Sequence, residues 1–195
     1  MYYFTSDTHF GGDDIILREK RPFKNSKIFL KKVIKLWNSQ TKKDDIIYVV
    51  GDFFNYNKND NTSWKKVVDV PKKIKGKIVI IIGNNEERII KNEFDNNFEN
   101  FKNFLVSKGF FDLKYEDYIN FGNNKYYLNH FPINKKNDYI NLFGHTHRAT
   151  GLWKPFGLNL DCDLNYFSLY SQNDIEKMIE EKRTFWDNDK NNLIM

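Results

Sequence analysis

The sequence has very little cysteine: Cys162 is the one cysteine among 195 residues. A single thiol excludes an intrachain disulfide framework, and without a Cys-x-x-Cys pair the chain cannot form a zinc finger. Because Cys162 lies in an apolar-flanked stretch, we interpret it as a small core residue. The apolar runs are also short, and none approaches the roughly 20 residues needed to span a bilayer.

An N-terminal secretory signal is also missing, because the first motif begins at Asp7 and leaves no space for a cleavable apolar segment. We therefore expect a cytoplasmic protein without membrane association. The length suits one domain, since domains commonly run about 100–200 residues, and we find neither an internal repeat nor a linker. We expect a single domain over residues 1–195, with a polar tail at about residues 184–195.

Charge of one sign is not concentrated in any segment. The chain carries 31 Lys and Arg against 26 Asp and Glu, a net charge of +5 that favours phosphate-bearing partners. The lysines are scattered, and Lys31, Lys32 and Lys35 fall on the polar face of a predicted helix. No basic block is interleaved with aromatic residues. A nucleic-acid partner is therefore permitted by the charge but has no specific support, and the oligomeric state is not predicted.

Apolar runs alternate with amphipathic stretches along the chain. β-Branched runs predict buried strands, whereas Leu30, Val33 and Trp37 recur at helical spacing and predict a helix. The first half is expected to contain strands at Tyr2–Thr5, Ile46–Val50 and residues 78–82, and helices at Ser26–Gln40, 63–70 and 97–108. The second half is expected to contain a hairpin of residues 118–121 and 125–129, strands at 139–143 and 158–162, and a closing helix at 174–182. These elements predict an α/β domain with a parallel first half and an antiparallel second half around one core.

The four histidines are the most informative residues, because each lies at or just beyond the end of a short apolar run. With two aspartates and an asparagine they form five motifs: Asp7-Thr8-His9, Gly51-Asp52, Gly83-Asn84, His130 and Gly144-His145-Thr146-His147. In open α/β sheets, functional groups gather beyond the carboxyl ends of the strands, and residues two apart in an extended backbone point to the same side. We therefore expect these side chains to meet at one sheet edge, rimmed by the polar loops at residues 53–62 and 133–138.

This donor set predicts a metal centre. Seven ligands are too many for one tetrahedral zinc ion but suffice for two ions that share one ligand, and a carboxylate such as Asp52 can give one oxygen to each ion. The expected ligands are Asp7, His9, Asp52 and His147 for the first ion, and Asp52, Asn84, His130 and His145 for the second. Nitrogen and oxygen ligands suit Mn²⁺, Fe, Zn²⁺ or Ni²⁺, and affinity order does not choose among them. We expect two divalent transition-metal ions, with Mn²⁺ placed first.

Such a centre indicates a phosphorylated substrate. Two divalent ions, two aspartates and a bridging hydroxide leave a small positive charge, which attracts phosphate oxygens. Paired ions clamp the attacking and leaving oxygens of a phosphoryl displacement, and they make the hydroxide between them nucleophilic near neutral pH. A purely structural use of these residues, with Asp in turns and His hydrogen-bonded in the core, accounts poorly for four histidines at such positions.

The sequence resembles the calcineurin-like metallophosphoesterases, and within them the small single-domain phosphoesterases of bacteria and phages. The resemblance extends over nearly the whole chain. It rests on the five motifs above, on their extensions Phe10-Gly11 and Phe53, and on Arg21-Pro22-Phe23. It implies a four-layer α/β/β/α sandwich of two mixed β-sheets flanked by helices, and it implies the ligand assignment given above.

Two positions depart from the pattern of that family. The family usually has Gly-Asn-His followed by an acid, and its histidine is thought to protonate the leaving group, but this chain has Gly83-Asn84-Asn85-Glu86. Asn85 can donate a hydrogen bond but cannot deliver a proton near neutral pH, and general acid catalysis is worth about 10²–10⁴-fold. Relatives often read Phe-Gly-His after the opening motif, whereas this chain reads Phe10-Gly11-Gly12-Asp13.

The sequence therefore predicts a binuclear metal-dependent phosphoesterase in which the bridging hydroxide attacks phosphorus. Asp52, Asn84 and Asn85 are its expected catalytic residues, and Arg21, Asn84 and Asn85 are expected to bind the substrate. A surface ion pair is the alternative for Arg21, and a helix start is the preferred interpretation of Glu86. Without the usual acid, the enzyme should favour phosphodiesters or good leaving groups, in a phosphorylated small molecule or a nucleotide. The alternative function is a catalytically weakened metal- or phosphate-binding protein with an interaction or regulatory role.

Overall fold

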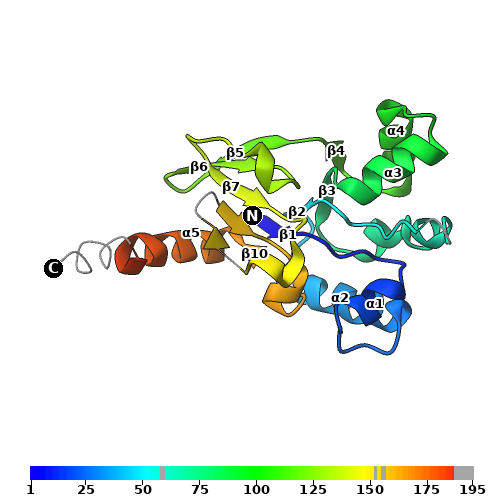
Figure 1. Ribbon diagram of the computed structural model, residues 1–195, viewed down its shortest axis with the longest axis horizontal. Coiled ribbons are helices and arrows are strands. Elements are labelled where there is room, and N and C mark those ends of the chain that lie inside the picture. The colour runs from blue at the N-terminus through cyan, green and yellow to red at the C-terminus, as the bar shows by residue number, and fades with distance from the viewer. Residues whose placement is uncertain (58–59, 152, 155–156, 187–195) are drawn as a thin grey trace.

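Two five-stranded β-sheets pack face to face and are flanked by helices (Figure 1). The computed structural model describes residues 1–57, 60–151, 153–154 and 157–186. The first sheet has the strand order β10-β1-β2-β3-β4, where β1 is Tyr2–Thr5, β2 Ile46–Val50, β3 Lys77–Ile81, β4 Asp112–Lys114 and β10 Tyr170–Ser171. Strands β1 to β4 are parallel, and β10 is antiparallel to β1. The predicted α/β sandwich of two mixed sheets flanked by helices is confirmed.

The second sheet has the order β5-β6-β7-β9-β8, where β5 is Asp117–Phe121, β6 Asn124–Leu128, β7 Ile140–Phe143, β8 Trp153–Lys154 and β9 Gly157–Asn159. β5 and β6 form the predicted hairpin, and β8 is antiparallel to β9. However, β7 is parallel to both β6 and β9, so the expectation of an antiparallel second half is wrong for these three strands. The connections after β6 and β7 are crossovers that lead to a parallel strand, and not hairpins that lead to an antiparallel one. The spacing of apolar residues does not show which of these two kinds of connection forms.

The α-helices of the described residues are α1 (Asp14–Arg18), α2 (Ser26–Gln40), α3 (Asn84–Glu93), α4 (Phe98–Lys108) and α5 (Gln172–Glu181). α2 has the predicted bounds, because the Asn25 side chain caps it by accepting a hydrogen bond from the Ile28 N–H. α4 ends where predicted, at Gly109, which adopts the left-handed conformation with a φ of 109°. No helix within the described residues combines the length and the apolar character needed to cross a membrane.

The last helix begins earlier than its sequence pattern indicates. α5 starts at Gln172 because the Ser171 hydroxyl caps it by accepting from the Asp174 N–H. The chain continues beyond α5 as a π-helical turn over Lys182–Trp186. The rest of the predicted polar tail, residues 187–195, lies outside the described residues.

Two short predicted elements take a different form. The helix predicted at 63–70 is a pair of 3₁₀ turns, Ser63–Val67 and Val70–Lys73, and Pro71 lies at the start of the second turn, where its missing N–H leaves no helical hydrogen bond unmade. The strand predicted at 158–162 ends at Asn159. Beyond it the Asp161 side chain caps a 3₁₀ turn by accepting from the Asp163 N–H. Cys162 begins that turn and is buried, as predicted for a core residue.

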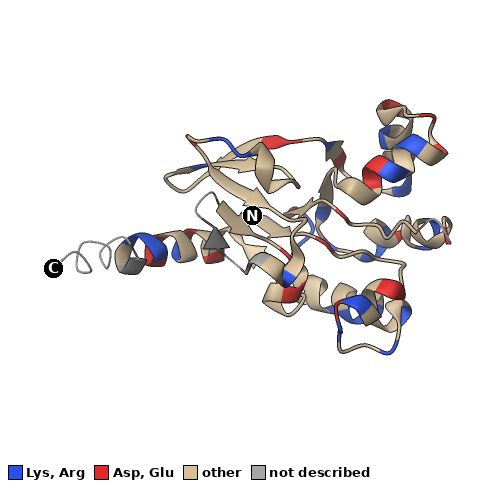
Figure 2. Cartoon of the chain, in the orientation of Figure 1, with Lys and Arg blue, Asp and Glu red and all other residues tan. Residues whose placement is uncertain are grey.

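Alternating side chains along the first sheet separate two hydrophobic cores. On β2, Ile47 and Val49 face the helices, whereas Tyr48 and Val50 face the second sheet. The first core contains buried side chains of α2, α3 and α4, and the second core fills the space between the sheets. Figure 2 shows that charged residues lie mostly on the helices and connections, while the central strands carry mostly other residues.

The two sheets are joined where their parallel strands end. Just beyond β1, the Ser6 N–H donates to the Leu160 carbonyl at 2.9 Å, and the Ser6 carbonyl accepts from the Cys162 N–H at 3.1 Å. These bonds place the end of β1 beside the chain that follows β9. The carboxyl ends of the parallel strands in both sheets therefore open onto one region, and every predicted metal ligand follows one of these strands.

Trp37 links the helix layer to the segments that carry these ends. Its side chain is fully buried, its ring lies edge-on to Phe10, and its indole N–H donates to the carbonyl of Phe167 at 3.0 Å. We expect Trp37→Ala to lower the free energy of unfolding by about 3–5 kcal/mol, because it leaves a cavity and an unpaired carbonyl. Urea unfolding measures this change. Lys35→Ala, on the exposed face of the same helix, is the control and should change stability by about 0.5 kcal/mol or less. Equal losses in the two variants would contradict a core role for Trp37.

Candidate metal centre

The side chains predicted as metal ligands converge from five strands. Asp7 and His9 follow β1, Asp52 follows β2, Asn84 follows β3, His130 follows β6, and His145 and His147 follow β7. They form two groups that are joined by Asp52, and each group brings together residues that are far apart in the sequence.

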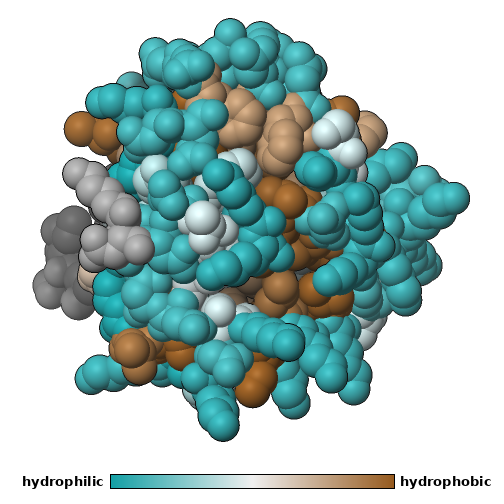
Figure 3. Space-filling model, turned by 90° about the vertical axis from the view of Figure 1, so that its right-hand side faces the viewer, coloured by the Kyte–Doolittle hydropathy of each residue, from teal (hydrophilic) through white to brown (hydrophobic). Residues whose placement is uncertain are grey.

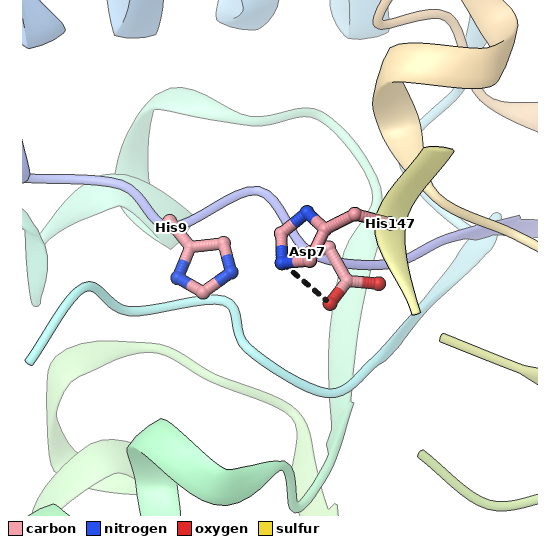
Figure 4. A group of neighbouring side chains, drawn as sticks. All are labelled: Asp7, His9 and His147. Atoms are coloured by element: carbon pink, nitrogen blue, oxygen red, sulfur yellow. Dashed lines mark ion pairs between the residues drawn. The ribbon is translucent and has the colours of Figure 1, made fainter. Parts of the chain in front are cut away.

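Asp7, His9 and His147 form the first group (Figure 4). The Nε2 atom of His147 is 3.8 Å from Oδ1 of Asp7, and the rings of His9 and His147 stack with centroids 5.1 Å apart. One potential ligand atom from each of these residues lies within 4.8 Å of the other two. The Nε2 atom of His9 is also 3.5 Å from Oδ2 of Asp52, which connects this group to the second one.

Asn84, His130 and His145 form the second group. The Oδ1 atom of Asn84 is 3.0 Å from Nδ1 of His145 and 3.3 Å from Nε2 of His130. The Oδ1 atom of Asp52 is 3.8 Å from Nε2 of His130. Asp52 therefore lies between the two groups, with one oxygen near His9 and the other near His130.

The backbone that carries these side chains is strained. Five of the residues have positive φ angles: Asp7 (56°), His9 (48°), Asp52 (53°), His145 (72°) and His147 (47°). Residues other than glycine seldom adopt this region, and the surrounding structure must hold them there. The Asp7 N–H donates to the Gly51 carbonyl at 3.0 Å and the His9 N–H donates to the Asp52 carbonyl at 2.9 Å, so the two loops lock each other in place.

Two glycines leave room for the convergence. A Cβ atom at Gly51, whose φ is 85°, would overlap the ring of His130. A Cβ atom at Gly83 would overlap the carboxylate and the backbone nitrogen of Asp52. A larger residue at either position would therefore displace one of these side chains.

The burial and chemistry of the groups fit divalent transition-metal ions. Asp7, His9, Asp52 and His130 are at most 3% exposed. Among the described residues, the buried Nε2 atom of His9 has no hydrogen-bond partner. Because buried polar atoms are rarely left unpaired, this nitrogen fits a ligand position better than a place in an ordinary core. Carboxylate, imidazole and amide donors together form a set that such ions accept.

Local electrostatics favour the metal-binding protonation states of His9, His145 and Asp52, but not of every histidine. Burial acts to lower the pKa values of His130 and His147, but nearby carboxylates outweigh it and both pKa values are raised. Burial lowers the pKa of His9 to about 3, and burial together with His130 lowers the pKa of His145, so both imidazoles are neutral near pH 7. Burial acts to raise the pKa of Asp52, but His130, His9 and hydrogen bonds from Asn85 outweigh it, and the pKa is lowered. Burial raises the pKa of Asp7 to about 6, a shift that a nearby cation would oppose.

Asn85, predicted as a catalytic and substrate-binding residue, is bonded to Asp52. Its Nδ2 atom donates to Oδ2 of Asp52 at 2.6 Å, and its backbone N–H donates to Oδ1 at 2.8 Å. Its Oδ1 atom accepts from the Tyr56 N–H at 2.9 Å. Asn85 is 4% exposed and lines the cleft described below. Its amide thus orients the carboxylate that lies between the two groups.

Glu86 ties the ends of β2 and β3 together. Its Oε2 atom accepts from the N–H groups of Asp52 and Gly83, both at 2.9 Å, and its Oε1 atom accepts from the Phe54 N–H at 3.1 Å. Burial is the main cause that raises the pKa of Glu86 to about 7. The residue lies in the first turn of α3, in line with its interpretation as a helix start, but the sequence does not reveal its bond to Asp52.

Arg21 binds the backbone of the loop after β1, which carries Asp7 and His9. Its guanidinium donates to the carbonyls of Thr8 at 2.7 Å and Asp7 at 2.8 Å, and it pairs with Asp163 at 2.8 Å. The residue is 4% exposed and is not among those that line the cleft. The ion pair considered for Arg21 is therefore present but buried rather than on the surface.

Asp161 is a further residue of this region, and it belongs to none of the five sequence motifs. Its Oδ2 atom is 3.2 Å from Nδ1 of His147, and the side chain is fully buried. A carboxylate on the far nitrogen of a metal-binding histidine fixes the orientation of the ring and raises its basicity. Asp161 follows β9, a parallel strand, so it has the same placement signal as the predicted ligands. Because the sequence pattern predicts a strand over 158–162, Asp161 is expected inside a strand and not just after one.

A cleft of about 850 Å³ opens onto the two groups. The cleft is lined mainly by polar and charged side chains: His9, Asp14, Arg18, Asp52, Asn55, Tyr56, Asn57, Asn84, Asn85, Arg88, Lys91, Asn92, His145 and His147. Part of the loop at residues 53–62 thus rims the site, as predicted, whereas no residue of the other predicted rim, 133–138, lines the cleft. Asp13, at a position of departure from the family pattern, accepts from the Ser26 N–H at 2.6 Å and so supports the start of α2.

Comparison with known proteins gives relatives of limited similarity. An uncharacterised protein of Methanocaldococcus jannaschii is 35% identical over 85 residues, which cover 44% of this chain and 46% of that protein, so the match spans about half of the relative. A protein of unknown function from Aquifex aeolicus has a structure with a TM-score of 0.62 and 20% identity, over 91% of this chain and 98% of that one. The structure of the nuclease MPE of Pseudomonas putida gives a TM-score of 0.47 and 21% identity, over 75% and 61% of the two chains. The Aquifex aeolicus structure shows the same fold.

The match to a protein family extends over most of the chain. The model of the calcineurin-like phosphoesterases matches residues 2–164, a span that contains every predicted metal ligand and both sheets up to β9. The motifs, the sandwich of two mixed sheets and the convergence of Asp, Asn and His at their carboxyl edge agree with this match. The chain therefore belongs to the calcineurin-like phosphoesterase family.

Proposed function

We propose that the protein is a binuclear metal-dependent phosphoesterase. The observation that carries this proposal is the position of Asp52, whose two oxygens face separate groups of imidazole and amide donors. Asp7, His9, Asp52 and His147 hold one ion in this proposal, and Asp52, Asn84, His130 and His145 hold the other. Mn²⁺ is placed first among Mn²⁺, Fe, Zn²⁺ and Ni²⁺; the carboxylate and amide oxygens suit Mn²⁺, and the four imidazoles suit the other three ions.

The chain supplies placement and orientation around these ions. Bound there, the ions would acidify water and withdraw charge from the phosphoryl oxygens. Asn85 holds the Asp52 carboxylate, and Asp161 holds the His147 ring. Glu86 fixes the backbone at Asp52, and Arg21 fixes the backbone at Asp7. These contacts support a rigid centre that needs little rearrangement when a phosphate binds.

The proposed reaction lacks protonation of the leaving group by residue 85. The Asn85 amide is committed to Asp52 and to the backbone of Tyr56, and an amide does not donate a proton near neutral pH. We therefore place phosphodiesters and other esters with good leaving groups ahead of alkyl monoesters. The same observation favours the alternative of a catalytically weakened metal- or phosphate-binding protein, and turnover measurements separate the two.

Replacement of Asp52 tests the catalytic proposal. We expect wild-type protein with added Mn²⁺ to hydrolyse bis(p-nitrophenyl) phosphate, and Asp52→Asn to reduce kcat by about 100-fold or more, because paired ions supply several kcal/mol of stabilisation. Asp44→Asn, at an exposed carboxylate, is the control and should retain the rate. Wild-type protein that binds Mn²⁺ in calorimetry without any turnover would support the binding-protein alternative instead.

Replacement of Asp161 tests its support of the metal centre. We expect Asp161→Asn to weaken Mn²⁺ binding by about 10–100-fold, because the weaker acceptor no longer raises the basicity of His147. Isothermal titration calorimetry measures the affinity, and circular dichroism shows that the variant is folded. Mn²⁺ affinity equal to that of Asp44→Asn would show that Asp161 has no part in metal binding.

A series of aryl and alkyl phosphodiesters tests the absence of an acid at residue 85. We expect the wild-type rate to fall steeply as the leaving-group pKa rises. Asn85→His should raise the rate on alkyl esters by up to about 100-fold while aryl esters gain little, because an acid matters most for poor leaving groups. The metal content of the variant is measured in parallel, since Asn85 also orients Asp52. A flat wild-type dependence would show that another group acts as the acid.

A further inference from the structure

One face of α3 extends the cleft away from the proposed metal centre. Asn84, Asn85, Arg88, Lys91 and Asn92 all line the cleft, and their spacing places them on the same side of the helix. The helix begins among the proposed ligands and continues outward, so Arg88 and Lys91 lie about 6 Å and about 10 Å further along its axis than Asn84.

The cations on this face are not neutralised by the rest of the described chain. The side chains of Arg88 and Lys91 are exposed, and no carboxylate within the described ranges forms an ion pair with either. The acid at the end of the helix, Glu93, pairs with Lys65 at 2.7 Å.

The opposite wall of the cleft contributes one acid, Asp14, and one base, Arg18. Its acid Asp14 accepts a hydrogen bond from the Asn55 amide at 2.9 Å, and Arg18 on the same helix pairs with Glu19 at 3.1 Å. Figure 3 views the molecule from the side on which α1 and α3 lie, and hydrophilic side chains dominate that face. Arg18 has a carboxylate partner, whereas Arg88 and Lys91, both on α3, line the cleft without one in the described ranges.

The size of the cleft exceeds what one phosphate requires. At about 850 Å³ it lies toward the upper end of the range of small-molecule sites, roughly 300–1,000 Å³. A simple phosphate ester would fill the part near Asp52 and leave the part beside Arg88 and Lys91 to solvent. The combination of unused volume and unpaired cations indicates a second anionic group on the substrate.

The geometry points to a second phosphate site on α3, formed by Arg88 and Lys91, that binds a phosphate joined to the scissile one through a nucleoside. The inference rests on the proposed function and specifies its substrate class. The backbone positions of Arg88 and Lys91, about 6 Å and about 10 Å beyond Asn84 along the helix axis, suit a spacer the size of one nucleoside better than a single anhydride oxygen. A free nucleotide with two phosphates and a short nucleic-acid strand both offer this chemistry.

Two chromogenic substrates with the same leaving group test the second site. Thymidine 5′-(p-nitrophenyl phosphate) lacks the second phosphate, and its 3′-phosphorylated form carries it. We expect the wild type to prefer the 3′-phosphorylated form by about tenfold or more in kcat/KM, since charge-assisted contacts between Arg or Lys and phosphate are among the stronger hydrogen bonds. Arg88→Gln and Lys91→Gln should each reduce this ratio, and the double variant should bring it close to one. Lys31→Gln, at an exposed position on α2, is the charge-matched control and should keep the wild-type ratio.

A binding measurement separates failure of the second site from failure of the proposed function. With Mn²⁺ present, calorimetry compares thymidine 5′-phosphate with thymidine 3′,5′-bisphosphate, whether or not either chromogenic substrate turns over. Tighter binding of the bisphosphate that is lost in Arg88→Gln supports the site even in an inactive protein. Equal affinities, or a preference that survives in the double variant, would overturn it. Competition by oligothymidylate then distinguishes the two sources: inhibition stronger than that by the bisphosphate indicates a strand, and weaker inhibition indicates a free nucleotide.

Discussion

Three carboxylates, those of Asp7, Asp52 and Glu86, are buried within one small volume, and the rest of the site is organised around this concentration of negative charge. Burial raises the pKa of Asp7 to about 6 and that of Glu86 to about 7. Carboxylates in a low-dielectric interior repel one another unless cations or hydrogen bonds compensate. Glu86 is compensated by three backbone N–H groups, and Asp52 by Asn85. Asp7 accepts from the Ser6 hydroxyl at 2.6 Å and from the His145 N–H at 3.1 Å, and a cation at the candidate metal centre would add further compensation.

The fold holds these charges in place by extending the pairing of its sheets beyond the strands. The Phe10 N–H donates to the Phe53 carbonyl at 2.8 Å, which continues the association of β1 with β2 into the ligand loops. Ser6 does the same between β1 and the chain after β9. Because these bonds are embedded in aromatic packing around Phe10 and Phe53, the positive φ angles of the candidate ligands are maintained by the core rather than by the candidate ligands themselves. The strained backbone of the site therefore depends on the packing of the core.

The sequence predicts those parts of the structure that depend on local patterns. The bounds of β1, α2 and β2 follow from apolar runs, helical periodicity and capping, and the candidate ligands follow from their placement after strands. The parallel course of β6, β7 and β9 is not local, since it depends on where long connections cross over. The supporting residues are not local either. Arg21 meets Asp163, Glu86 meets Asp52, and Asp161 meets His147, and the partners in each pair are brought together only by the completed fold.

In the proposed reaction, the basic face of α3 compensates for the lack of an acid at Asn85. An enzyme that gives its leaving group no proton must obtain rate from placement of the substrate and from charge stabilisation at phosphorus. Binding energy from a distant part of the substrate can supply that placement, because a phosphate held beside Arg88 restricts the orientation of the scissile one. An amide at position 85 also keeps Asp52 fixed through a short hydrogen bond. In this proposal, the chain combines a rigid centre that lacks an acid at residue 85 with a cationic helix face, a combination suited to substrates that carry more than one phosphate.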